Sequence, residues 1–97
     1  MKHIEFHLEA VQELIKAKEW YRLRSEMASQ AFALEVDNAI RSIADAPERW
    51  PESEGGIRRK VLQRFPYTVL YRTRSETIYV IAVAHQRRRP GYLHTRK

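Results

Sequence analysis

The sequence has 97 residues, 43% of them hydrophobic, and a formal net charge of +6. This length and composition are typical of one globular domain spanning residues 1–97, and they exclude a largely disordered chain. The absence of cysteine excludes a disulfide scaffold and thiolate chemistry. The N-terminus lacks a signal-peptide core, and no apolar run approaches the ~20 residues that span a bilayer, so we expect a cytoplasmic protein with no membrane contact.

Charge is divided unevenly along the chain. Residues 1–56 carry seven Lys or Arg against eleven Asp or Glu, whereas residues 57–97 carry eleven against one. Positive charges at this density repel one another unless a partner of opposite charge neutralises them. The division therefore predicts an anionic partner, either a polyanion or an acidic protein; a basic face kept solvated for solubility is the alternative.

The N-terminal half predicts a strand followed by two helices. Alternation of polar and apolar residues over 3–7 favours a short strand, and apolar side chains recur at helical spacing over 8–24. We place the break between the helices at residues 27–29, with Ser29 as a possible N-cap. Pro47 ends the second helix. The two apolar stripes consist of Ala10, Val11, Leu14, Ile15, Ala17 and Tyr21, and of Phe32, Val36, Ala39, Ile40 and Ile43.

The C-terminal half predicts three strands. A loop over 47–56 is dense in breakers, and Trp50 is expected to anchor it. Strands follow at 57–64, 67–73 and 76–85, the last two joined as an antiparallel hairpin, and the nearly continuous apolar run of 76–85 favours a central strand. The order predicts an α+β fold in which a two-helix hairpin packs on one face of a small antiparallel β-sheet. The other face or its rim is then free for function.

No metal or cofactor site is predicted. His3 and His7 are four residues apart, but on a strand this spacing separates them too far to share a metal easily. No phosphate-binding loop and no nucleophile triad can be recognised. Enzymatic chemistry, if present, would have to use the cations and single acid–base side chains of the C-terminal half.

Arginines dominate that half. The planar guanidinium pairs with phosphate or carboxylate through two parallel hydrogen bonds. Strand alternation predicts that Arg58, Lys60 and Arg64 share one face and that Arg59 lies on the other. We expect Arg22, Arg41, Arg49 and Arg74 to be solvated or ion-paired, and we favour a functional role for Arg59, Arg64, Arg87 and Arg88.

Three further positions are candidates near the sheet rim. His85 ends the apolar strand, where it either serves as acid or base or closes the strand through a hydrogen bond. Tyr92 follows a Pro-Gly turn, and it either stacks on a base or donates a proton, or caps the core. Pro66 removes a ladder donor, which predicts a bulge or an edge there, with Phe65 in the core.

Four motifs together resemble the RelE/ParE toxin superfamily of type II toxin–antitoxin systems: EWY, AIRSIADAPERWP, IRRKVLQRFPYTVLYR and IYVIAVAHQRRRPGY. The chain looks most similar to the plasmid-stabilisation, ParE-like branch. The resemblance implies two helices on a curved antiparallel sheet, a growth-inhibiting toxin, no cofactor, and neutralisation by a cognate antitoxin in a hetero-oligomer. A basic sheet face fits an acidic, wrapping antitoxin by charge complementarity.

The resemblance is compatible with two cellular targets. ParE-like toxins inhibit DNA gyrase, whereas RelE-like toxins are metal-independent endoribonucleases that cleave mRNA on the ribosome. For the second activity, the resemblance assigns Arg59, Arg64 and either Arg87 or Arg88 to the phosphate, with His85 as base and Tyr92 as the C-terminal tyrosine. The loop over 47–56 has no lysine, although RelE-like toxins often rely on lysines there, and this difference favours gyrase. Whether the protein is an enzyme stays open at this point.

Overall fold

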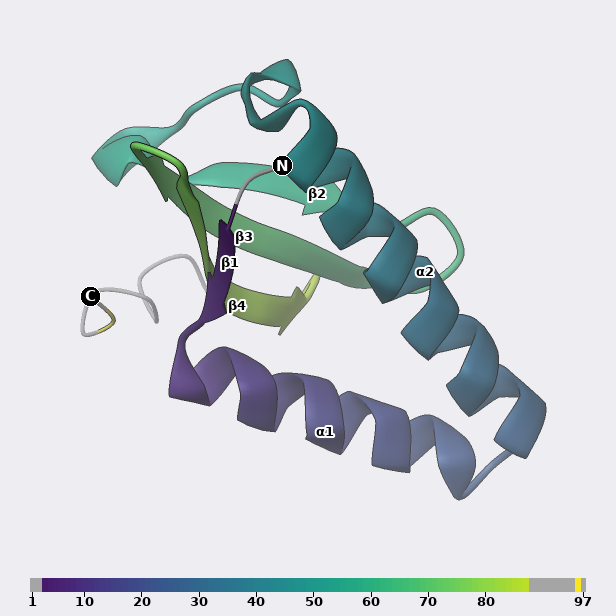
Figure 1. Ribbon diagram of the computed structural model, residues 1–97. Coiled ribbons are helices and arrows are strands. Elements are labelled where there is room, and N and C mark those ends of the chain that lie inside the picture. Colours follow the sequence, from purple (N-terminus) through teal and green to yellow (C-terminus); the bar gives the residue numbers. More distant parts are fainter. Residues whose placement is uncertain (1–2, 88–95, 97) are drawn as a thin grey trace.

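The computed structural model describes residues 3–87 and 96. Strand β1 (His3–Phe6) leads into helices α1 (Leu8–Arg22) and α2 (Glu26–Asp45), and strands β2 (Arg58–Val61), β3 (Tyr67–Arg74) and β4 (Thr77–His85) follow (Figure 1). This β-α-α-β-β-β order confirms the predicted α+β fold. Within the described residues, no helix is long and apolar enough to cross a membrane.

The helical hairpin turns earlier than predicted. Ser25 is the N-cap of α2, because its Oγ accepts a hydrogen bond from the Ala28 N–H at 3.2 Å. The predicted break at residues 27–29 is wrong. Ser29 lies inside the helix, where only 6% of its surface is exposed, and its hydroxyl donates to the Lys18 carbonyl at 3.0 Å. The two serines differ in their contact with α1, a contact that local sequence does not reveal.

The sheet has the strand order β1-β4-β3-β2. The meander of β2, β3 and β4 is antiparallel as predicted, whereas β1 pairs in parallel with β4, so the complete sheet is mixed. Parallel neighbours need a long connection, and here the helical hairpin together with β2 and β3 lies between β1 and β4 in the chain. Figure 1 shows β1 beside β4, with the two helices spreading from their shared turn.

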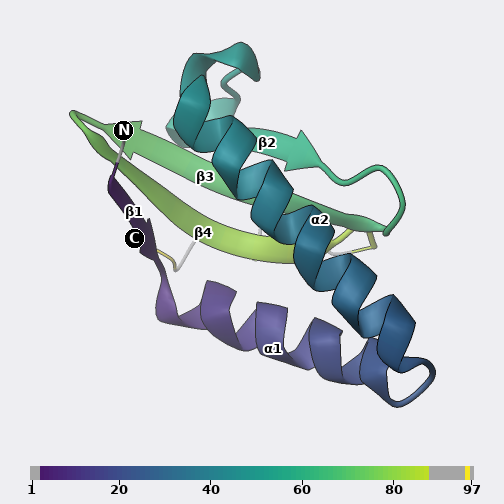
Figure 2. The ribbon, with the colours of Figure 1, turned by 45° about the vertical axis from the view of Figure 1, so that its right-hand side comes forward.

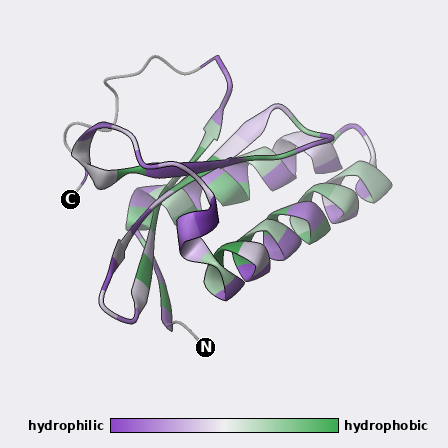
Figure 3. Cartoon of the chain, turned by 90° about the horizontal axis from the view of Figure 1, so that it is seen from above, coloured by the Kyte–Doolittle hydropathy of each residue, from purple (hydrophilic) through white to green (hydrophobic). Residues whose placement is uncertain are grey.

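Both helices cover the same face of the sheet (Figure 2). The predicted stripe of α2 is confirmed, with four of its five residues buried, and Ile40 packs beside them. On α1 the stripe is narrower than predicted, since Ile15 is 60% exposed. Apolar and polar residues alternate around both helices in the hydropathy view (Figure 3). The fully buried side chains of this core include Phe32, Ile43, Val69, Tyr71, Ile78, Val80 and Val83.

One residue of β4, Ile81, has no partner on β3. Leu70 pairs with Ala82, but the next residue, Tyr71, pairs with Val80. A bulge of this kind shifts every later side chain to the opposite face. Val80 therefore packs in the core beneath the helices, whereas Ala82 joins a second small cluster on the other face. Pro66, where a bulge or edge was predicted, instead immediately precedes β3.

Candidate functional site

The bulge decides where His85 lies. After Ile81 the odd-numbered residues of β4 point toward the helices, so His85 shares a face with Val83. Its ring contacts Tyr67 edge-on, with 5.1 Å between ring centroids. Both rings line a pocket of ≈ 370 Å³ between α1 and the open end of the β3–β4 hairpin, where β3 begins and β4 ends. The other lining residues are Glu13, Lys16, Ala17, Trp20, Tyr21, Pro66 and Val83.

The pocket is bordered by an aromatic cluster. Tyr21 contacts Phe32, Phe65 and Tyr67 at centroid distances of 5.2, 5.1 and 6.4 Å. Phe65 packs against the core as predicted. Burial raises the pKa of Tyr21, and the neighbouring Tyr67 raises it further. The Tyr21 phenol therefore stays neutral at physiological pH and offers a hydrogen bond rather than a charge.

Hydrogen bonds hold the chain at His85. The Arg87 N–H donates to His85 Nδ1 at 3.1 Å, and the Gln86 N–H donates to the Pro66 carbonyl at 2.9 Å. The first bond turns the imidazole toward the backbone that follows β4, and the second joins that backbone to the start of β3. The arrangement agrees with a histidine that closes the strand.

Arg64 lies outside β2, in the turn that leads to β3. Its guanidinium contacts Glu35 of α2 at 3.5 Å, and its side chain is 67% exposed. Glu35 also accepts hydrogen bonds from the backbone N–H groups of Gln63 and Arg64. The prediction that Arg64 continues the alternation of the strand is wrong, because β2 ends at Val61. Glu35 holds this turn against the helix.

Arg59 is on the opposite face of the sheet from His85. It pairs with Leu70, which belongs to the cluster on the face away from the helices, and it is exposed. Its neighbours Arg58 and Lys60 point the other way, as predicted. Arg58 donates to the Trp50 carbonyl, and the Lys60 ammonium lies 5.1 Å from the centre of the Trp50 ring. Trp50 thus anchors its loop as expected.

The sequence-predicted site residues are therefore spread over three places. His85 and Arg87 are neighbours at the end of β4, Arg64 is on the turn beside α2, and Arg59 is on the far face. Arg88 and Tyr92 lie outside the described residues. Arg22 and Arg41 form ion pairs with Glu19 and Asp37 on their own helices, as predicted. Among residues 3–87 and 96, no three His, Asp or Glu side chains are placed to hold a metal ion.

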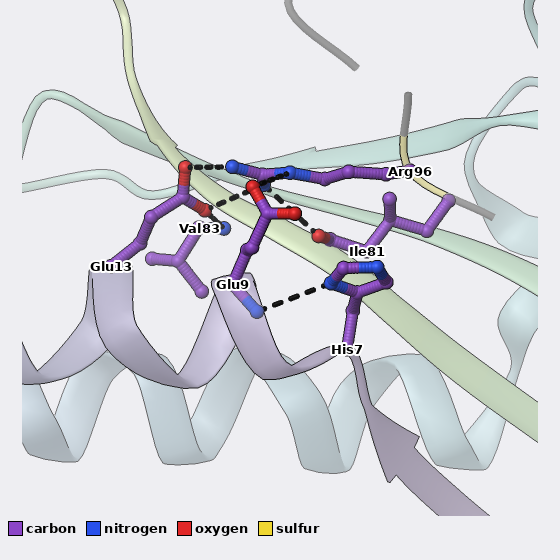
Figure 4. Close-up of polar contacts among 6 residues, drawn as sticks. All are labelled: His7, Glu9, Glu13, Ile81, Val83 and Arg96. Carbon is purple, nitrogen blue, oxygen red and sulfur yellow. Dashed lines mark hydrogen bonds and ion pairs between the residues drawn. The ribbon is translucent and has the colours of Figure 1, made fainter. Parts of the chain in front are cut away.

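One charged cluster was missed by the sequence reasoning. Arg96, whose side chain is only 6% exposed, contacts Glu9 and Glu13 of α1 and the carbonyl of Ile81 (Figure 4). The sequence gives one weak indication of it. Two glutamates four residues apart lie on one face of a helix and repel each other, which favours a cation nearby. Nothing local indicates that this cation comes from the other end of the chain.

Comparison with known proteins identifies the class of protein to which the chain belongs. Residues 4–90 match the family model described as ParE toxin of type II toxin–antitoxin system, parDE. The fold and this match define a toxin component of a type II toxin–antitoxin system. The chain belongs to the ParE toxin family.

A solved structure supports the fold independently. A chain of the chromosomal ParDE toxin–antitoxin system from P. aeruginosa superposes with a TM-score of 0.74 at 18% identity. The superposition covers 88% of the present chain and 96% of that chain. Likeness at this identity establishes the shared architecture. No curated protein matches the sequence significantly.

Proposed function

We propose that this toxin inhibits DNA gyrase by binding and does not break bonds itself. The observation that carries the proposal is the separation of three nuclease candidates that the structure describes. Arg59 and His85 lie on opposite faces of the sheet, and Arg64 is engaged by Glu35. Stabilising the phosphate of a cleavage reaction would require these side chains to converge on one site. Membership of the ParE family points to the same target.

The same proposal includes a cognate antitoxin as partner. The P. aeruginosa relative is part of a ParDE toxin–antitoxin system. In the present fold the acidic half of the chain forms the helical layer, and the basic half forms β2, β3 and β4. The sheet side therefore suits an acidic or amphipathic antitoxin segment in a hetero-oligomer by charge complementarity. We place the complex in the cytoplasm, where either target is found.

The test compares two targets with one purified protein. One reaction measures supercoiling by gyrase, and the other uses primer extension to detect cleavage of mRNA on translating ribosomes. We expect supercoiling to be inhibited and the mRNA to stay intact. Cleaved mRNA with normal supercoiling would instead establish the endoribonuclease, and Arg64→Ala would then be expected to abolish cleavage while antitoxin binding survives.

A truncated chain locates the inhibitory surface. A protein ending at Gln86 lacks all cations that follow β4, including the buried Arg96, so its melting temperature is measured beside its potency. In protein that remains folded we expect a loss of at least about tenfold in inhibitory potency. Arg41→Ala is the matched control, since Arg41 is 77% exposed and contacts only its helix neighbour Asp37 among the ion pairs described. Truncated protein that inhibits supercoiling as well as the full chain would place the surface elsewhere.

A further inference from the structure

A pocket lies on the face of the sheet that is turned away from the helices. Figure 2 shows both helices on one side of β3 and β4. The pocket has a volume of ≈ 400 Å³, and none of the described residues that line it belongs to either helix. They come from β1 and the residue after it, from the end of β3, and from β4 as far as the bulge. This volume is within the range of about 300–1,000 Å³ that is typical of ligand sites.

Strand pairing places three side chains of this pocket in one row. Tyr79 of β4 pairs with Arg72 of β3 on one side and with Glu5 of β1 on the other. Paired residues of neighbouring strands point to the same face, on strands about 4.8 Å apart. That face is the one away from the helices, because Tyr71 and Val80, their chain neighbours on β3 and β4, pack in the core. The Tyr79 ring, 38% exposed, therefore lies between a guanidinium and a carboxylate.

Two guanidinium groups belong to this part of the face. Arg74 follows Arg72 by two residues, so both point the same way, about 6.5 Å apart along the strand. Arg72 Nε donates to the Gly55 carbonyl at 3.0 Å, which orients the side chain. Its terminal nitrogens form no hydrogen bond within the described part of the chain, and the exposed Arg74 has no ion-pair partner there. Two planar forks are thus available, and such forks bind phosphate oxygens in pairs.

Glu5 discriminates between two kinds of anionic ligand. Its carboxylate lies 3.2 Å from His3 Nε2, on the side of Tyr79 opposite to the arginines. An acidic peptide could pair with the arginines, but Glu5 would repel a carboxylate placed over the ring. A nucleobase is uncharged, stacks on aromatic rings, and carries amines from which a carboxylate accepts hydrogen bonds. The order of cation, ring and carboxylate therefore matches the phosphate, base and exocyclic amine of a nucleotide.

We propose that this face binds single-stranded nucleic acid. Tyr79 stacks on one base, and Arg72 and Arg74 bind the phosphates beside it. Glu5 accepts a hydrogen bond from the exocyclic amine of that base. The bases of a duplex are stacked inside the helix and cannot reach the ring. None of the described residues assigned to mRNA cleavage lines this pocket, so the site binds without cutting. Such binding does not depend on gyrase as the target.

The experiment measures the affinity of the purified full chain for fluorescein-labelled oligonucleotides of about eight nucleotides, by anisotropy at several salt concentrations. The probes are oligo-dC, oligo-dT, oligo-rC and a dC·dG duplex. Every variant keeps the cations that follow β4, so their non-specific attraction cancels in the comparison. Melting temperatures are recorded throughout. Arg41→Gln, on the exposed side of α2, is the matched control for net charge. The test variants are Tyr79→Leu, Tyr79→Phe, Arg72→Gln, Arg74→Gln and Glu5→Ala.

We expect Tyr79→Leu to weaken the binding of oligo-dC about tenfold, whereas Tyr79→Phe, which keeps the ring, should stay within about twofold of the wild type. Arg72→Gln and Arg74→Gln should each weaken binding several-fold and reduce the salt slope by about 0.7, as the loss of one phosphate contact requires. Arg74→Gln, at an exposed position, decides the matter if Tyr79→Leu does not fold.

The base preference tests Glu5. Cytosine carries an exocyclic amine where thymine carries a carbonyl. The wild type should therefore bind oligo-dC several-fold more tightly than oligo-dT, and Glu5→Ala should remove the difference. Equal affinities of the wild type for the two probes would overturn the role of Glu5. Binding of either oligo-dC or oligo-rC supports the proposal, and the tighter of the two identifies the sugar.

Three results would overturn the site as a whole. One is equal affinity of the wild type for duplex and single strand, and another is equal affinity of Tyr79→Leu and Tyr79→Phe for oligo-dC. The third is Arg74→Gln binding as tightly as Arg41→Gln. A glutamate-rich peptide is added as a competitor. If it displaces the oligonucleotide equally from the wild type and from Tyr79→Leu, the face belongs to an acidic peptide instead.

Discussion

Tyr71 joins the sheet to the end of α2 through a single polar atom. Its ring is fully buried in the core, and its hydroxyl donates to the Pro47 carbonyl at 2.6 Å. Pro47 follows Ala46, the C-cap of α2, and opens the short 3₁₀ turn Pro47–Arg49, so the phenol joins β3 to the first residue beyond the helix cap. The contact fixes the direction in which the chain leaves the helix toward the loop anchored by Trp50.

Replacing Tyr71 by Phe should therefore lower the free energy of unfolding by about 0.5–1.5 kcal/mol, because a part-buried hydrogen bond is lost while the ring stays packed. Urea unfolding followed by circular dichroism measures the loss. Tyr79→Phe is the matched control, since Tyr79 is 38% exposed and should change stability by less than about 0.5 kcal/mol. Equal losses in the two variants would contradict the role assigned to the Tyr71 hydroxyl.

The helical hairpin depends on how α2 starts. Ser25 caps the helix and Glu26 occupies its first turn, where a negative charge favours the helix dipole. Ser29, inside the helix, instead holds α2 against α1 through the Lys18 carbonyl. Ser25 therefore stabilises the start of α2, whereas Ser29 stabilises the packing of α2 against α1.

Ser25→Ala should cost about 1 kcal/mol, since the Ala28 N–H loses its acceptor at the helix end. Chemical denaturation gives the value directly. Gln30→Ala on the exposed side of α2 provides the reference, with an expected change of less than about 0.5 kcal/mol. The capping assignment fails if Ser25→Ala is as stable as this reference.

Over the whole molecule, charge separates by layer. Acidic residues outnumber basic ones over the two helices together, and basic residues prevail in β2 and β3. Three ion pairs join the helices to other parts of the described chain: Glu35 with Arg64, and both Glu9 and Glu13 with Arg96. Glu35 also accepts from the backbone of the β2–β3 turn, and Glu13 and Arg96 contact the backbone of β4. The pairs therefore lie at positions where the backbone is irregular.

Stability of the whole molecule should fall at alkaline pH. Burial raises the pKa of both Tyr21 and Tyr71 above the ordinary value. Because the folded pKa exceeds the unfolded value of about 10, the stabilisation is complete below pH ~10 and is lost as the pH rises through the folded pKa. Urea unfolding between pH 8 and 11.5, at about 25 °C, tests this. Tyr71→Phe should flatten the decline, and a wild-type stability that stays constant to the upper limit would contradict the assignment.

Periodicity predicted the elements well, because local spacing determines them. The stripe from Phe32 to Ile43 and the β3–β4 hairpin needed no information from elsewhere in the chain. The parallel pairing of β1 could not be predicted, since strand partners are chosen by tertiary packing. The bulge at Ile81 could not be predicted, because β4 is apolar on both faces. Its sequence therefore has no polar–apolar alternation that would show which residues face the helices.

The candidate site was predicted less well for a related reason. Residue type indicated which arginines to consider, but the faces of the sheet determine which of them meet. Arg59 was correctly predicted to lie on the face opposite Arg58 and Lys60, whereas Arg64 lies beyond the end of β2. Arg96 escaped notice because its partner Glu13 is 83 residues away in sequence. The roles of Arg59, Arg64, His85, Arg87, Arg88 and Tyr92 stay predictions.

The unpaired Ile81 has a consequence for how related chains can vary. Before this residue, even-numbered positions of β4 face the helices; after it, odd-numbered positions do. Deletion of Ile81 itself would leave these faces unchanged, because Val80 and Ala82 already face opposite sides and would then pair with Tyr71 and Leu70 in a regular ladder. A one-residue deletion elsewhere in the strand, with the bulge kept, would exchange the two faces of everything beyond it. Natural length variation within β4 should accordingly be confined to the position of Ile81, and an alignment that opens a gap elsewhere between Thr77 and His85 would pair residues that occupy opposite sides of the protein.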